Sequence, residues 1–369
     1  MRMIGLMSGT SLDGVDAVLV DFDARGRPTL AAQWHQPYPD DLLAGLRTMD
    51  GDTPLRTVLD RDARLADVYA GAVEALLGAT GAERAAVAGI ALHGQTLWHA
   101  PAADPPVSCQ AGDPSRVAEA TGIDVIADFR QRDLAAGGEG APLAPLFHSA
   151  LFGSDAPRNV INIGGVANIS ALATGGRVHR GFDTGPGNAL MDAWTRRHRG
   201  AAFDEDGRWA AAGQVDRSCL ERLLADAYFQ RPPPKSLDVH TLDLAWVGRH
   251  AGPGASPVDV QATLLALTVE SIARAVEAWG GQPADVVLAG GGARNPVLRQ
   301  ALARRLAPRP VITTDALGIG CEWVEAVGFA WLGRAALQRE PQDLTAITGS
   351  GRPVVLGGIY PGQARSHAE

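Results

Sequence analysis

The stretch from Met3 to Phe22 reads MIGLMSGTSLDGVDAVLVDF and predicts two strands joined by a turn. Residues 3–7 are short and apolar, and residues 15–22 form a longer apolar run. Between them, residues 8–14 are rich in serine, glycine and aspartate, which favour turns. Because glycine lets backbone N–H groups approach phosphate oxygens and hydroxyl groups add donors, this hairpin turn is a candidate phosphate site.

A similar unit follows at residues 159–172, which read NVINIGGVANISAL. It predicts a strand over 159–163, a tight turn at Gly164 and Gly165, and a returning strand over 166–172. Strand, glycine turn and strand thus recur, which indicates a weak internal duplication with one copy in each of two domains. The second turn is a second candidate phosphate site.

Helices and strands alternate in the last third of the chain. We expect a helix over 260–279, a strand over 285–289, a helix over 296–306 that starts at Asn295, a strand over 310–313 and a helix over 323–337. Gly290, Gly291 and Gly292 form a third glycine turn after a strand. Earlier, a helix is expected over 56–77, with Leu59, Leu65 and Tyr69 on its apolar face, and a strand over 87–92. Such units build parallel α/β sheets.

Length and composition limit the number of domains and the kinds of partner that we expect. A chain of 369 residues exceeds the usual size of one core, so we expect an N-terminal α/β domain over 1–138 and a C-terminal one over 139–369. The C-terminal tail is a candidate to pack onto the first domain. The net charge of -8 argues against nucleic acid as the main partner.

The three cysteines, Cys109, Cys219 and Cys321, fit neither zinc spacing nor a disulfide framework. With no signal peptide and no apolar run near the ~20 residues that span a bilayer, we expect a cytoplasmic protein that does not associate with membranes.

Two common nucleotide-binding motifs are missing. A P-loop needs a lysine after a glycine-rich loop, but the single lysine of the chain, Lys235, follows three prolines instead. No Gly-x-Gly-x-x-Gly joins the first strand to a helix, which disfavours a dehydrogenase. The remaining way to bind a nucleotide is a pair of phosphate-binding hairpins.

The best catalytic candidate is Asp183, in the stretch 181–188, which we read as a glycine-rich loop. A kinase needs a base near its nucleophile. The alternative is that Asp183 caps the helix that begins at Ala189. His93 to His99 offer polar groups and an aromatic face for a sugar, and Arg130 suits a carboxylate or phosphate, although an ion-pair cluster explains that arginine equally well.

Several of these stretches resemble one family closely. Residues 7–16, 93–96, 127–130, 162–169, 181–188 and 353–362 are similar to those of anhydro-N-acetylmuramic acid kinases, over nearly the whole chain. The resemblance implies the two-domain actin-like ATPase (ribonuclease H-like) α/β fold with an interdomain active-site cleft. It also implies an ATP-dependent reaction in cell-wall (peptidoglycan) recycling, in which water opens the C1–O6 bridge of 1,6-anhydro-N-acetylmuramic acid while O6 takes the γ-phosphoryl group.

The resemblance also implies roles for individual residues. Asp183 is then the base that activates the water, and Thr96, Arg130 and Glu325 contact the sugar. ATP with Mg²⁺ and a homodimer are also implied. The residues implied to bind the nucleotide are Gly9, Thr10, Ser11, Leu12, Asp13, Gly14, Val15, Asp16, Gly164, Gly165, Gly290, Gly291, Gly292 and Asn295.

Two departures from the family pattern stand out. Gly5 and Leu6 occupy the place where many proteins of this fold carry a magnesium-binding aspartate, so no metal ligand is assigned. Residues 236–240 lack the Thr-Gly-Arg-Glu expected after Lys235. Two rival functions are a kinase of the same fold that acts on an ordinary sugar hydroxyl, and an ATP-dependent binding protein of the Hsp70-like kind. The second usually carries an extra module, for which 369 residues leave no room.

Overall fold

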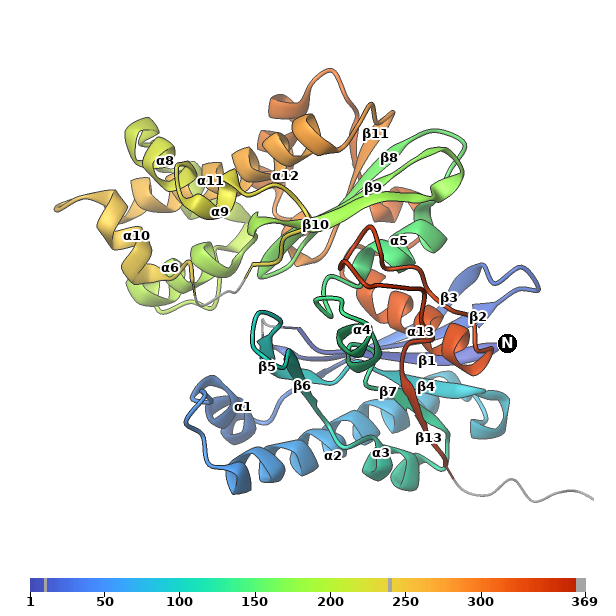
Figure 1. Ribbon diagram of the computed structural model, residues 1–369. Coiled ribbons are helices and arrows are strands. Elements are labelled where there is room, and N and C mark those ends of the chain that lie inside the picture. Colours follow the sequence, from blue (N-terminus) through green and yellow to red (C-terminus); the bar gives the residue numbers. More distant parts are fainter. Residues whose placement is uncertain (10–11, 238–240, 363–369) are drawn as a thin grey trace, which may run out of the picture. The chain divides into compact units, whose positions relative to one another are not determined.

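The structure is a computed structural model that describes residues 1–9, 12–237 and 241–362 (Figure 1). The chain forms two compact units. Unit 1 comprises Met1–Ala141, Glu325–Thr345 and the chain from Gly349 on, and unit 2 comprises Pro142–Val324 and Ala346–Thr348. The domain boundary expected between residues 138 and 139 and the interdomain cleft stay predictions.

Unit 1 contains a six-stranded sheet, a separate hairpin and five α-helices among its described residues. Its elements are β1 (Arg2–Met7), β2 (Gly14–Phe22), β3 (Pro28–Pro37), α1 (Asp40–Arg47), α2 (Leu55–Thr80), η1 (Arg84–Ala86), β4 (Gly89–Leu92), β5 (Gln95–Ala100), β6 (Val107–Ala111), α3 (Pro114–Thr121), β7 (Val125–Ala127), α4 (Gln131–Ala135), α13 (Val324–Leu337) and β13 (Gly358–Tyr360).

Unit 2 contains a five-stranded sheet. Its elements are α5 (Ala144–Phe152), β8 (Arg158–Ile163), β9 (Val166–Leu172), η2 (Thr174–Gly176), β10 (Val178–Pro186), α6 (Ala189–Arg199), η3 (Glu205–Gly207), α7 (Arg208–Ala211), α8 (Arg217–Leu224), α9 (Ala227–Gln230), α10 (Leu244–Ala251), α11 (Pro257–Trp279), β11 (Asp285–Ala289), η4 (Gly291–Arg294), α12 (Pro296–Leu306), β12 (Val311–Thr313) and η5 (Thr314–Leu317).

The two sheets repeat one strand order. In unit 1 the order is β3-β2-β1-β4-β7 with β13 added at the edge, and in unit 2 it is β10-β9-β8-β11-β12. In each, the first three strands are antiparallel, and the last two run parallel to the first strand. The predicted duplication is confirmed at the level of strand order. The predicted fold class, an actin-like ATPase built on ribonuclease H-like sheets, is also confirmed.

Helices cover both faces of the unit 1 sheet. α1, α2 and α3 lie along one face of the sheet (Figure 1). Their side chains form one buried cluster with those of β1, β2, β4 and β7. On the other face, α13 approaches β1 so closely that a Cβ on Gly5 would lie 2.0 Å from the carbonyl oxygen of Ala326. A residue with a side chain at position 5 would therefore push α13 off the sheet.

One expectation about α2 is wrong. Leu65 and Tyr69 are fully buried, as expected for the apolar face, but Leu59 is 58% exposed. The helix begins at Leu55, and the residues of α2 in the buried cluster start only at Leu65. The apolar pattern therefore continues past the part of the helix that the core covers.

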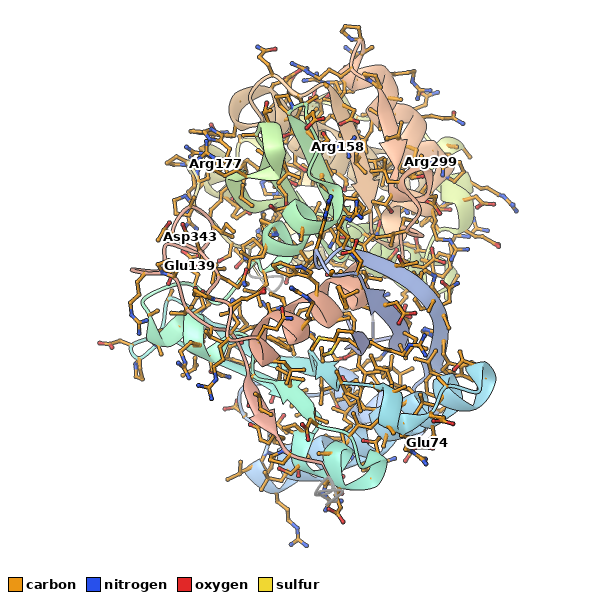
Figure 2. The ribbon with its side chains drawn as sticks, turned by 90° about the vertical axis from the view of Figure 1, so that its right-hand side faces the viewer. Glu74, Glu139, Arg158, Arg177, Arg299 and Asp343 are labelled. Carbon is orange, nitrogen blue, oxygen red and sulfur yellow. The ribbon has the colours of Figure 1, made fainter. Side chains whose placement is uncertain are left out.

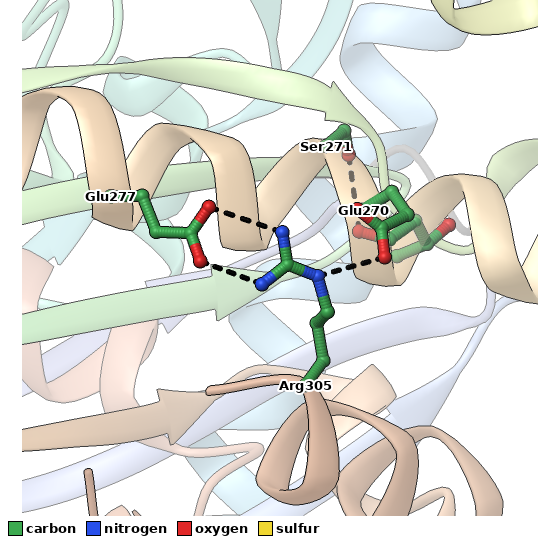
Figure 3. Close-up of polar contacts among 5 residues, drawn as sticks. Glu270, Ser271, Glu277 and Arg305 are labelled. Atoms are coloured by element: carbon green, nitrogen blue, oxygen red, sulfur yellow. Dashed lines mark hydrogen bonds and ion pairs between the residues drawn. The ribbon is translucent and has the colours of Figure 1, made fainter. Parts of the chain in front are cut away.

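The unit 2 sheet is likewise covered on both faces. The long helix α11 contributes more side chains to the main cluster than any other helix, and α6, α8, α10 and α12 contribute the others, with one from α7. Arg305 of α12 donates to Glu270 and, with two nitrogens, to Glu277, both on α11 (Figure 3). On the opposite face, His148 of α5 bonds to Ser170 of β9 at 2.7 Å. Since side chains alternate along a strand, Ser170 and its neighbour Ile169 face opposite sides.

Parallel strands β8 and β11 are joined at their start by an ion pair. Arg158, labelled in Figure 2, lies in unit 2. It donates two hydrogen bonds of 2.8 Å to Asp285, and it also donates to the carbonyl of Phe152. The side chains are 14% and 19% exposed. This fixes the register of the two strands whose far ends carry glycine turns.

None of the helices in the described part of the chain combines the length and the apolar character that a membrane span requires.

Candidate active site

The first turn, between β1 and β2, is held from below by buried polar groups. Gln95 donates from Nε2 to the carbonyl of Gly9 at 3.2 Å and accepts from the hydroxyl of Tyr38 at 3.0 Å. The hydroxyls of Ser8 and Tyr69 are hydrogen-bonded to each other. The carbonyl of Gly9 is thus hydrogen-bonded inside the protein. This arrangement is compatible with backbone N–H groups of the turn that face an anion.

The remaining residues predicted in the first turn differ in environment. Leu12 has a positive φ of 56° and donates from its backbone to Gly9 at 3.3 Å. Val15 lies in the buried cluster of unit 1, and Asp16 on β2 is hydrogen-bonded to His35. Gly14 allows the close approach of β3, because a Cβ there would lie 2.3 Å from the carbonyl oxygen of Gln36. Thr10 and Ser11 lie outside the described residues.

Arg130, one of the predicted sugar contacts, is bound to the buried His93. Arg130 donates from one nitrogen to His93 Nε2 at 2.9 Å and from another to the carbonyl of Gly140 at 2.8 Å. The ring of Phe329 lies 4.6 Å from the ring of His93, and Glu325 stands one helical turn before Phe329 on α13. Burial, and then the charge of Arg130, hold the pKa of His93 well below its ordinary value, so His93 is neutral and accepts from Arg130.

Thr96, the third predicted sugar contact, lies on β5. Its hydroxyl accepts a hydrogen bond from Gln110 Nε2 of β6 at 3.3 Å, so the β5–β6 hairpin sets its position. Position 96 follows the buried residues His93 and Gln95 on the same stretch. Residues 93–96 therefore combine the buried His93, the Gln95 amide that holds the first turn, and the hydroxyl of Thr96.

In unit 2 the second and third glycine turns meet. A Cβ on Gly290, whose φ is 79°, would lie 2.5 Å from the side chain of Asn162, at the end of β8. One on Gly292 would lie 2.4 Å from Ile163 and 3.0 Å from the side-chain nitrogen of Asn188. The turn at 290–292 therefore packs on the end of the strand that leads into Gly164 and Gly165, and it does so because it lacks side chains.

The start of α6 packs under the same hairpin turn. The backbone N–H groups of Asn188 and Ala189 donate to the carbonyls of Gly164 and Gly165. A Cβ on Gly187 would lie only 2.3 Å from the carbonyl oxygen of Gly164. Asn295 caps α12, since its side chain accepts from the N–H groups of Val297 and Leu298.

Asp183 lies on a strand, and the expectation of a loop there is wrong. β10 runs through Pro186, with Asp183 opposite Asn168 of β9 and a bulge between Asp183 and Gly185. The glycines serve close packing against neighbouring side chains: a Cβ on Gly185 would lie 2.9 Å from Phe229. Asp183 is 9% exposed. The capping alternative also fails, because Asn188 is the residue that precedes α6.

The chain from α9 to Leu237 holds Asp183 at three points. The Leu237 N–H donates to Asp183 Oδ2 at 2.9 Å, the Asp183 N–H donates to the carbonyl of Lys235 at 3.1 Å, and the Tyr228 hydroxyl donates to the carbonyl of Asp183 at 2.6 Å. Sequence reasoning missed Tyr228, Lys235 and Leu237. One signal was available: Lys235 is the single lysine of the chain.

Among the residues described, no three histidine, cysteine, aspartate or glutamate side chains gather as a metal site.

Two ribonuclease H-like sheets with glycine turns at their strand ends define the fold class of the actin/hexokinase-like proteins. Residues 1–362 match the family "Anhydro-N-acetylmuramic acid kinase". The chain belongs to this family, whose enzymes phosphorylate an amino sugar of cell-wall turnover.

Curated relatives agree with this assignment. The chain is 47% identical over 370 residues to the anhydro-N-acetylmuramic acid kinase of Cupriavidus pinatubonensis, with 98% of each chain covered. It is also 47% identical over 365 residues to that of Chromobacterium violaceum, with 97% of this chain and 98% of the relative covered.

Similar solved structures are far more distant in sequence. One is a ROK family glucokinase from Streptomyces griseus in complex with glucose and AMPPNP, with 15% identity, a TM-score of 0.42, and 90% of this chain and 99% of that chain covered. Another is (R)-2-hydroxyglutaryl-CoA dehydratase component A of Acidaminococcus fermentans, with 13% identity, a TM-score of 0.49, and 90% and 96% covered.

Proposed function

We propose that this chain converts 1,6-anhydro-N-acetylmuramic acid, water and ATP into N-acetylmuramic acid 6-phosphate and ADP, with Asp183 as the base. The single observation that carries the proposal is the setting of Asp183: a nearly buried carboxylate whose Oδ2 is held by a backbone N–H at 2.9 Å. A carboxylate fixed in this way takes a proton from a positioned water without first reorganising.

The reaction balances in one sequence of bond changes. Water attacks C1, one of its protons passes to the Asp183 carboxylate, and the C1–O6 bond breaks. O6 then carries the electron pair that forms the bond to the γ-phosphorus, while the bond from that phosphorus to the β–γ bridging oxygen breaks and ADP leaves. The proton on Asp183 is finally released to solvent.

The glycine turns are proposed to hold the nucleotide. Gly9 to Asp16 and Gly164-Gly165 would face its phosphates, and Gly290, Gly291, Gly292 and Asn295 would lie against its adenosine. Close packing of the two unit 2 turns supports a shared binding surface for them. The N–H groups at the N-terminus of α12 are less available to an anion, because the Asn295 side chain already accepts from two of them.

Arg130, Thr96 and Glu325 are proposed to hold the sugar. Arg130 is fixed by two hydrogen bonds and retains the permanent charge that suits a lactyl carboxylate. Because His93 is neutral, it does not offset the positive charge of Arg130.

We propose that Mg²⁺ accompanies ATP, where it neutralises charge on the phosphates. The carboxylates of Asp13 and Asp16 near the first turn are oxygen donors of the kind that Mg²⁺ prefers, so the donor chemistry fits. Mg²⁺ usually keeps the phosphates and water as most of its ligands, and no residue is assigned to it.

A homodimer and a cytoplasmic location are also proposed. Three free thiols, two of them buried, support a reducing compartment. Light scattering on the purified chain tests the dimer: a mass of one chain at micromolar concentration would exclude it.

The proposed function is tested by mass spectrometry of the products formed in ¹⁸O-labelled water with Mg-ATP and 1,6-anhydro-N-acetylmuramic acid. One heavy oxygen at C1 of a phosphorylated product is expected, read before anomeric exchange and against a product control. Asp183→Asn should lower kcat by at least a thousandfold, since the base is lost. ATP consumption that leaves the anhydro sugar intact would reject the substrate, and ordinary sugar hydroxyls would then be screened.

A further inference from the structure

Lys235 is a buried cation that the proposed reaction does not yet use. Its residue is only 6% exposed, and its Nζ donates to the carbonyl of Tyr228 at 3.1 Å. The Nζ also lies 4.5 Å from the centre of the Tyr228 ring and 5.9 Å from that of Phe182. A lysine is rarely buried unless something in the protein requires it there.

The contacts of Lys235 converge on Asp183. Tyr228, whose carbonyl and ring hold the ammonium group, donates its own hydroxyl to the carbonyl of Asp183. The carbonyl of Lys235 accepts from the Asp183 N–H, and two residues further on Leu237 donates to the Asp183 carboxylate. The Lys235 side chain therefore ties α9 to the segment that holds the carboxylate.

Charged groups around Lys235 act in opposite directions. Burial lowers its pKa to about 8, and the nearby Arg231 lowers it too, whereas the Asp183 carboxylate raises it. Among the described residues, the carbonyl and ring of Tyr228 and the ring of Phe182 also lie at the ammonium group. The negative charge of Asp183 and the positive charge of Lys235 thus stabilise each other in a poorly solvated place.

We propose that Lys235 is a positioning residue for Asp183: its charged ammonium group anchors residues 235–237 to α9 and so fixes the orientation of the Asp183 carboxylate. The inference rests on the proposed role of Asp183. It predicts that turnover requires Lys235 in its protonated form, although Lys235 touches neither substrate nor the reacting atoms.

The single lysine makes the electrostatic part directly measurable. In protein labelled with ¹³C and ¹⁵N in lysine only, one lysine side chain contributes the signal. Its pH titration should give a pKa near 8, and the pKa should fall in Asp183→Asn, because the stabilising negative charge is gone. A pKa that is unchanged by Asp183→Asn would overturn the proposal, because the two charges would then not interact.

Kinetics test the positioning part. Lys235→Met should lower kcat at least tenfold while the KM for ATP stays within about threefold, since binding groups are untouched. In the unaltered protein kcat should decline above about pH 8. Lys235→Arg, which keeps its charge at every accessible pH, should move this decline above pH 10 and restore part of the kcat lost in Lys235→Met.

The outcomes separate the two proposals. An unchanged kcat in Lys235→Met, or the same alkaline decline in Lys235→Arg, rejects the role of Lys235 even if Asp183→Asn is inactive. If Asp183→Asn is active, Asp183 is not the base, and Lys235 then has no catalytic carboxylate to position. The lysine titration needs no substitution at position 235, so it decides the electrostatic contact even if Lys235→Met fails to fold.

Discussion

Burial shifts the pKa values of individual side chains in this protein, and His148 is a clear case. His148 on α5 is fully buried, and its Nδ1 is hydrogen-bonded to the hydroxyl of Ser170. Burial lowers the pKa of His148 to about 3. His148 has no role in the proposed reaction, so its titration is followed through stability.

The pH dependence of stability follows from the sign of that shift. Because the folded-state pKa of about 3 lies below the unfolded value of about 6.5, the unfolded chain binds a proton that the folded chain does not. His148 therefore lowers the free energy of unfolding by about 1.4 kcal/mol per pH unit as pH falls through this window.

His148→Gln, which keeps a polar partner for Ser170, should remove that part of the slope. Urea unfolding of both proteins at pH 6.5, 5.5 and 4.5 measures it, and the other titrating groups, His93 among them, cancel in the difference. Parallel pH profiles for the two proteins would show that His148 titrates normally in the fold.

Single residues of the site were only partly predictable. A carboxylate among glycines indicates Asp183 as a catalytic residue, and the resemblance to the kinase family supports it. Its partners Tyr228 and Leu237 stand 45 and 54 positions away, and no local pattern connects them. Contacts of this kind depend on how α9 and the chain after it return to β10.

At the scale of elements, the parallel pair β8 and β11 depends on a well-formed ion pair at its start. Arg158 and Asp285 are opposite each other in register and share two charged hydrogen bonds of 2.8 Å. Arg2 and Asp21 form a similar two-bond pair between β1 and β2, but their side chains are 33% and 45% exposed. The two pairs differ mainly in solvation.

Arg158→Met should therefore cost more than Arg2→Met. Removal of Arg158 leaves Asp285 poorly solvated, with an expected loss of about 2 to 3 kcal/mol in the free energy of unfolding. The exposed control pair should be worth about 0.5 kcal/mol. Chemical denaturation of both variants measures the difference, and equal losses would contradict the argument.

Strong apolar runs made some elements predictable and others not. The strand over 285–289 and the helix over 296–306 have the predicted bounds, because a buried parallel strand and a capped amphipathic helix leave clear signals. β3 was missed, since it is an edge strand with mostly exposed or partly exposed side chains. The strand β10 was read as a loop because its glycines serve packing against other elements.

For the whole molecule, unit 1 draws on both ends of the chain. α13 covers one face of its sheet, and β13 pairs with β7 at the sheet edge. The repeated hairpin and the packing of the C-terminal tail on the first domain were expected from the sequence. The return of α13 was not, because its clearest sign is the lack of a side chain at Gly5.

A chain that ends after Val324 should consequently lose unit 1 and keep unit 2. The truncation removes α13 and uncovers Gly5, Ala91 and His93 on the sheet face, whereas nearly all of unit 2 lies within 142–324. Hydrogen exchange read by mass spectrometry should show β1, β2 and β4 unprotected and β8, β9 and β11 protected. Protection of β1 and β4 equal to that of the full chain would contradict this.

The same discontinuity sets an order of events at the ribosome. Translation delivers residues 142–324 in one uninterrupted stretch, so unit 2 has all but three of its residues while synthesis continues. The N-terminal strands, although made first, wait for a helix and a strand that are made last. During that interval the nascent chain carries an uncovered apolar sheet, which makes its beginning the part most in need of a chaperone.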